Sequence, residues 1–247
     1  MMMKFVVQLY LVAVQLTLVQ GQDIGKYVYS SEGFNYTVNV YEGADVNIAF
    51  EVPGRPVFVD GKYQLVRDSH TQYSMDFSDA IDGVRYIYYH IGALLGGMTF
   101  NPADLTVLTY TTADSMTVNF AGRELTLTRV GYDLQPGVFY HRISEAPRLS
   151  ITFRLLAEGS YQVVFSCGDT AVAYGGLWLE KAARPYKHYA VVESGRDAVN
   201  SLRAEIESTC SFEGLQDGDL SRMTFITQEA IIIPFQRRRM LLEKVTL

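Results

Sequence analysis

The chain has 247 residues, of which 27 are acidic and 21 are basic, so its formal net charge at pH 7 is −6. An acidic chain is a poor candidate for nucleic-acid binding, because contact with phosphates needs a basic surface. The length suits one large domain that buries enough apolar surface to fold without several disulfides.

The N-terminal segment has the pattern of a secretory signal peptide. Lys4 precedes an apolar run from Phe5 to Val19, and Val19-Gln20-Gly21 is an acceptable cleavage context. The run is shorter than the ~20 residues that a spanning helix needs. We therefore expect residues 1–21 to be removed, the mature chain to begin near Gln22, and the protein to be secreted and extracellular without a membrane span.

The first half of the mature chain reads as a succession of short strands. Residues 36–52 alternate apolar and polar side chains, which is the period of a half-buried strand. Asp60-Gly61 predicts a hairpin between residues 57–59 and 62–66. Residues 84–91 predict a further strand, on which Tyr86, Tyr88 and His90 share one face.

Residues 105–110 and 116–120 predict a second hairpin, followed by a strand over 125–130. Met116, Val118 and Phe120 share a face of this hairpin. Residues 92–102 and 132–147 are rich in turn-forming residues and predict connections. No internal repeat is evident.

The pattern changes once in the last part of the chain. Residues 149–155 and 161–167 alternate as strands, and their one-sided apolar residues include Ile151, Phe153, Tyr161, Val163 and Phe165. Val199, Leu202, Ile206 and Cys210 then recur at steps of three and four, which predicts a helix over residues 197–209. Residues 223–228 predict a closing strand. About ten strands with turns at short intervals favour an all-β fold.

This order of elements resembles the C-terminal part of apolipoprotein D-type lipocalins. The resemblance rests on the string Tyr161–Cys167, on Leu177-Trp178-Leu179 followed by Arg184-Pro185, and on the helix and strand that follow. It implies an antiparallel up-and-down β-barrel with a C-terminal α-helix. Lipocalins also carry Gly-x-Trp near the mature N-terminus, which is absent here. Arg184 would be the arginine that normally packs on that tryptophan.

These observations predict one lipocalin-like barrel domain over residues 22–233, followed by a basic tail over residues 234–247. Arg237-Arg238-Arg239 in that tail reads either as a protease-processing site or as part of a flexible end. Asn35-Tyr36-Thr37 is a sequon, so we expect N-glycosylation at Asn35.

The two cysteines of a secreted chain favour one disulfide, Cys167–Cys210, and two free thiols are the alternative. One difficulty is evident in the strand pattern. Cys167 shares a face with Tyr161, Val163 and Phe165, so its sulfur points away from a helix packed outside the barrel. A bridge at the strand end, or a bulge, would resolve this difficulty.

The sequence carries no motif for catalysis. The four histidines lack metal-motif spacing, and neither a Gly-x-Ser-x-Gly nor a phosphate-binding loop occurs. We therefore expect no enzyme activity, no cofactor and no metal.

The function that this pattern predicts is transport of a small hydrophobic ligand, such as a lipid, pigment, retinoid or odorant-like molecule, in a barrel cavity. The candidate cavity residues are Tyr86, Tyr88, His90, Met116, Val118, Phe120, Ile151, Phe153, Tyr161, Val163 and Phe165. The alternative is an immunoglobulin-like β-sandwich that acts in recognition or structure, and a secreted hydrolase is less favoured. The sequence leaves the oligomeric state open.

Overall fold

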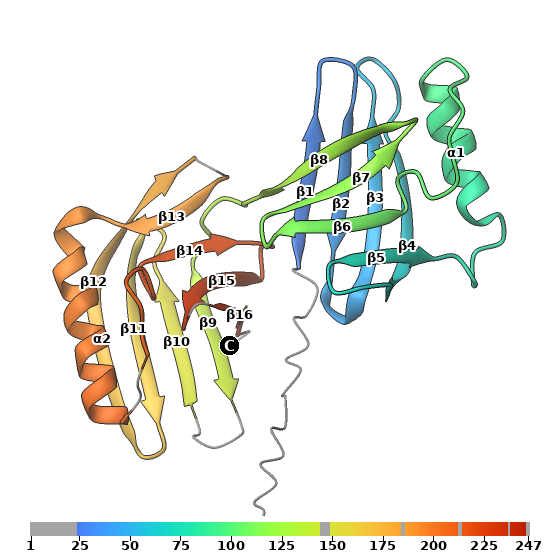
Figure 1. Ribbon diagram of the computed structural model, residues 1–247. Coiled ribbons are helices and arrows are strands. Elements are labelled where there is room, and N and C mark those ends of the chain that lie inside the picture. The colour runs from blue at the N-terminus through green and yellow to red at the C-terminus, as the bar shows by residue number, and fades with distance from the viewer. Residues whose placement is uncertain (1–23, 144–148, 184–185, 212–213, 237, 246–247) are drawn as a thin grey trace, which may run out of the picture.

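The structure is a computed structural model that describes residues 24–143, 149–183, 186–211, 214–236 and 238–245. The expected signal peptide, Arg184 and Arg237 lie outside these residues. Antiparallel strands form two closed barrels of eight strands each (Figure 1), where we expected one barrel. Because both sheets close, neither is the open sandwich of the alternative interpretation.

The first barrel contains one long helix, α1 (Gly83–Leu94), between its fifth and sixth strands. Its strands are β1 (Gly25–Ser30), β2 (Asn35–Val40), β3 (Asp45–Glu51), β4 (Phe58–Arg67), β5 (Gln72–Asp76), β6 (Val107–Thr112), β7 (Ser115–Phe120) and β8 (Arg123–Val130). Each strand pairs with the next, and β8 pairs with β1 to close the sheet.

The second barrel places helix α2 (Arg196–Cys210) at the same point, after its fifth strand. Its strands are β9 (Gly137–Ile143), β10 (Leu149–Leu155), β11 (Ser160–Cys167), β12 (Thr170–Ala182), β13 (His188–Val191), β14 (Arg222–Phe225), β15 (Ala230–Phe235) and β16 (Arg238–Lys244). The expected C-terminal helix is therefore present, but three strands follow it. In a lipocalin-like arrangement the helix would come after the barrel.

Two predictions are wrong because the local sequence pattern in each case is compatible with two different secondary structures. Residues 84–91 form helix α1, in which Ile87 and Ile91 are buried one turn apart. Their neighbours are aromatic and β-branched, which produced the strand signal. Asp60-Gly61 is not a hairpin turn but lies inside β4, where the register with β3 shifts.

The expected basic tail is also wrong, since it forms the closing strand. Residues 230–235 and 238–244 pair as β15 and β16, and β16 then pairs with β9. Without this strand the second sheet would keep two open edges, which sheets avoid. The single-domain boundary at residue 233 therefore falls inside the second barrel.

The two barrels repeat one another in chain order as well as in topology. Residues 101–130 correspond to residues 216–245 without a gap, at a spacing of 219 − 104 = 115 positions. The equivalent residues Leu105 and Leu220 both have positive φ, of 60° and 61°. The repeat was not evident in the sequence because only eight of these 30 pairs are identical.

A buried aspartate holds the same corner in each barrel. Oδ2 of Asp104 accepts hydrogen bonds from the backbone N–H groups of Asn101, at 2.8 Å, and Ala121, at 3.0 Å. Oδ2 of Asp219 accepts from Gln216, at 2.8 Å, and Gln236, at 2.9 Å. Hydrogen bonds to a carboxylate are stronger than those between neutral groups. Each aspartate therefore holds the segment that leads into the sixth strand of its barrel next to the turn of the following hairpin.

We expect Asp219→Ala to lower the free energy of unfolding by about 2–4 kcal/mol, because two partly buried backbone donors lose a charged acceptor. The measurement is urea denaturation followed by the fluorescence of Trp178, which lies on β12 of the same barrel. Asp217→Ala is the matched control, since Asp217 is exposed and, among the described residues, forms its ion pair with Arg203 alone. Equal midpoints for Asp219→Ala and the parent chain would contradict the role of this aspartate.

Candidate functional site

The interior of the second barrel is apolar and aromatic. Strand alternation directs five of the predicted cavity residues to its inner face: Ile151, Phe153, Tyr161, Val163 and Phe165. The ring of Phe153 stacks on that of Tyr161 at 5.6 Å. These residues belong to one continuous buried cluster that also includes Phe139 and Phe225.

Tyr161 brings a polar group into this apolar interior. Its side chain is only 1 % exposed, and its hydroxyl has no hydrogen-bond partner among the described residues. Burial raises the pKa of Tyr161, so the hydroxyl remains a neutral donor. A buried polar group without a partner costs about 1–3 kcal/mol, which makes this position a candidate for contact with a bound molecule.

Helix α2 covers the inner side of the wall rather than its outside. Cys167 has the same strand parity as Tyr161, and it forms a disulfide with Cys210 at the end of the helix. At the start of the helix, a Cβ on Gly195 would lie 2.7 Å from Val191 and 3.8 Å from Leu177. Both are buried core residues of β13 and β12, so the difficulty with the direction of the Cys167 sulfur disappears.

The predicted cavity residues of the first barrel divide into two groups. Met116, Val118 and Phe120 lie in its core on β7, as expected for inner-face residues. Tyr86, Tyr88 and His90 lie instead on helix α1, so the expectation that they share a strand face is wrong. The Tyr88 hydroxyl donates to the carbonyl of Asp104 at 2.8 Å, whereas the rings of Tyr86 and His90 pack against Phe58.

A charged contact joins the two barrels. Asp114, in the turn between β6 and β7, forms ion pairs with Arg129 of β8 and with Arg239 of β16. The Arg129 guanidinium lies 4.7 Å above the ring of Tyr27, and the neighbouring carbonyl of Ala113 accepts from Arg239 at 3.0 Å. Arg239 belongs to the run that we read as a processing site or flexible end, and it binds the first barrel.

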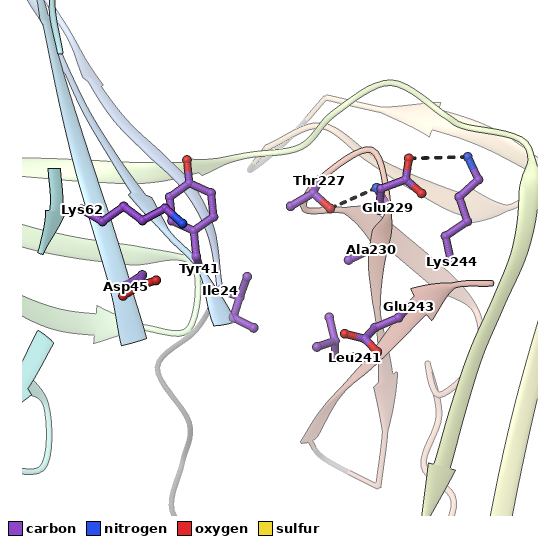
Figure 2. Close-up of a pocket in the computed structure, with 10 residues that line it drawn as sticks. All are labelled: Ile24, Tyr41, Asp45, Lys62, Thr227, Glu229, Ala230, Leu241, Glu243 and Lys244. Atoms are coloured by element: carbon purple, nitrogen blue, oxygen red, sulfur yellow. Dashed lines mark hydrogen bonds and ion pairs between the residues drawn. The ribbon is translucent and has the colours of Figure 1, made fainter. Parts of the chain in front are cut away.

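The described residues also form a cleft of about 660 Å³ between the barrels (Figure 2). Its walls are Ile24, Tyr41, Asp45 and Lys62 on the first barrel and Thr227, Glu229, Ala230, Leu241, Glu243 and Lys244 on the second. Lys244 and Glu229 form an ion pair across 3.9 Å, and Asp45 accepts a hydrogen bond from Gln64. The cleft therefore carries side chains of both charges, and some of these already form ion pairs or hydrogen bonds within the protein.

Sequence reasoning missed Tyr27, Arg129 and Arg239, because their roles depend on which strands meet when a barrel closes. Asn35 begins β2, where its side-chain amide donates to Glu51 at 3.3 Å, and its glycosylation stays a prediction. Across the described part of the chain, no group of three or more His, Cys, Asp or Glu side chains could hold a metal ion. None of the described helices combines the length and the apolar character needed to cross a membrane.

The sequence matches no model of a known protein family and no curated protein.

We expect Arg239→Gln to loosen the connection between the barrels while leaving each barrel folded, because it removes the ion pair to Asp114 and the bond to Ala113. The measurement is the rate of limited proteolysis within residues 131–136, which join β8 to β9. Arg238→Gln is the matched control, since the exposed Arg238 lies next to it on β16. Cleavage of both variants at the rate of the parent chain would contradict an inter-barrel role for Arg239.

Proposed function

We propose that this chain is a secreted, non-catalytic carrier that holds a small, mainly apolar molecule inside its second barrel. The observation that carries the proposal is the buried Tyr161 hydroxyl without a partner in an apolar interior. A ligand oxygen placed beside it would supply the missing acceptor. Burial of apolar ligand surface contributes affinity at about 25 cal/mol per Å², before the costs of ordering.

The neutral state of Tyr161 narrows the ligand class. The inner-face residues around it are aliphatic or aromatic, and the ring of Phe153, which stacks on it, offers no hydrogen bond. A buried charge needs a partner of opposite sign. The proposed ligand is therefore neutral at its buried end, with a carbonyl, ether or hydroxyl oxygen.

A second set of contacts supports a lipocalin-like ancestry for both barrels. Gly25-Lys26-Tyr27 begins β1, and Arg129 of the closing strand lies over the ring of Tyr27. In a lipocalin a tryptophan occupies this ring position, with an arginine packed on it. Gly137-Val138-Phe139 begins β9, and Lys244 of β16 pairs with Phe139 in the same register. We propose that each barrel keeps a variant of this contact, in which Tyr27 and Phe139 replace the tryptophan.

We expect Tyr161→Phe to weaken binding of an apolar ketone by about three- to tenfold, the value of one neutral hydrogen bond. Binding of the hydrocarbon of equal length should stay unchanged. The measurement is competition against the fluorescent apolar probe 1-aminoanthracene on the secreted full-length chain. Tyr140→Phe, on the outer face of β9, is the matched control.

The proposal fails if neither compound displaces the probe, or if Tyr161→Phe affects the ketone and the hydrocarbon equally. Native mass spectrometry of the secreted chain tests the same point without a chosen probe. A co-purified neutral apolar molecule would support the carrier, whereas consistently empty protein that also fails to bind the ketone would contradict it.

A further inference from the structure

A bulge in β4 turns a carboxylate toward the inner side of the first barrel. Asp60 pairs with Ile48 and Tyr63 pairs with Val46, with one extra residue, Lys62, between the two pairings. Ile48 and Val46 are fully buried core residues. Residues paired directly across a sheet share a face. Asp60 and Tyr63 therefore both face the side that α1 covers, although they are three positions apart.

The Asp60 carboxylate is held by hydrogen-bond donors and not by a cation. The Tyr63 hydroxyl donates to its Oδ2 at 2.6 Å, and the Gly61 backbone N–H donates to its Oδ1 at 2.9 Å. None of the ion pairs formed within the described ranges of the chain includes Asp60. Burial, and then the bond to Asp60, raises the pKa of Tyr63, so the tyrosine stays neutral.

Aromatic rings from α1 and β4 gather beside this carboxylate. His90 stacks on Phe58 at 5.3 Å, and Tyr86 contacts both of these rings, at 4.3 Å from His90 and 5.9 Å from Phe58. Tyr86 is also close enough to Tyr63 to raise the pKa of its hydroxyl. We call Phe58, Asp60, Tyr63, Tyr86 and His90 the Asp60 aromatic cluster.

The cluster is accessible and is specific to the first barrel. Tyr86 is 42 % exposed, and Phe58, Asp60 and Tyr63 are half-buried. In the second barrel the residue at the position of Asp60 is Tyr174, which pairs with Val163 as Asp60 pairs with Ile48. Burial, and then Glu205 of α2, raises the pKa of Tyr174, so the carboxylate near this position belongs to the helix and the strand position itself is uncharged.

We propose that the Asp60 aromatic cluster binds a small organic ammonium cation. Ring faces attract such cations at distances up to about 6 Å from the ring centroid, and a carboxylate supplies the opposite charge. A metal ion would need several oxygen or nitrogen ligands, whereas this cluster offers one carboxylate among rings. A neutral ligand would leave the carboxylate without a new partner. The site is separate from the barrel-2 interior, and the proposal does not depend on the carrier function.

The experiment is calorimetric titration of the secreted full-length chain with choline and with its uncharged carbon analogue 3,3-dimethyl-1-butanol. The two molecules have the same shape, so the ratio of their Kd values isolates the effect of charge. We expect choline to bind at least about tenfold more tightly than the alcohol. This is the effect of one desolvated cation–π contact together with the opposite charge of a carboxylate. Equal affinities, or no saturable binding of choline at millimolar concentrations, would overturn the proposal.

Two further comparisons locate the site. Asp60→Asn should remove the preference for choline over the alcohol. Tyr86→Ala should weaken the binding of choline by about tenfold. Tyr89→Ala is the matched control on the same helix, because Tyr89 is 73 % exposed and its ring is perpendicular to that of His90, at 87°. Circular dichroism checks that Asp60→Asn stays folded. Because Tyr86 lies on helix α1, Tyr86→Ala tests the same site without changing the β4 bulge.

Choline affinity that is unchanged in both Asp60→Asn and Tyr86→Ala would overturn the assignment of the site. Tyr161→Phe should leave choline binding unchanged, which keeps this test separate from that of the carrier.

Discussion

Where each sheet closes, a basic side chain of the last strand lies across a glycine of the first strand. A Cβ added to Gly25 would lie 2.2 Å from Nη1 of Arg129, and one added to Gly137 would lie 2.6 Å from Cε of Lys244. Both glycines also have positive φ, of 146° and 155°, which other residues rarely adopt. The glycine at each position therefore leaves the space that the basic side chain occupies beside the closing pair of strands.

The repeated barrels have diverged in how they use the same positions. In the first barrel Tyr27 and Asp114 enclose the Arg129 guanidinium, which is almost completely buried. In the second barrel Phe139 lacks the hydroxyl, and the equivalent pair of Lys244 and Glu229 is longer and borders the cleft. The helices have diverged as well, since a disulfide attaches α2 to β11 and aromatic packing attaches α1 to β4. A duplicated fold can thus present two different interiors.

Sequence patterns predicted the strands with period-two alternation, the helix at α2 and the Cys167–Cys210 bridge, because each depends on local spacing or on a single pairing. They failed where one local sequence pattern is compatible with two different structures. Tyr86 and Tyr88 alternate as in a strand but belong to a helix whose buried stripe is Ile87 and Ile91. Asp60-Gly61 favours a turn but forms a bulge, which hid the face that Asp60 occupies. The second barrel was missed because its closing strand begins in an arginine-rich run, and charge there suggested a tail.

The contact between Arg239 and the Asp114 turn is heterologous, since it joins two different patches of the repeated unit. Such contacts can propagate from molecule to molecule into fibres unless a mismatch stops them. Here the residue equivalent to Arg239 in the first barrel is Glu124, and the residue equivalent to Asp114 in the second barrel is Glu229. A further copy added in the same manner would bring two glutamates together, and their like charges would repel. Like charges at these two positions thus oppose the addition of a further copy through this contact.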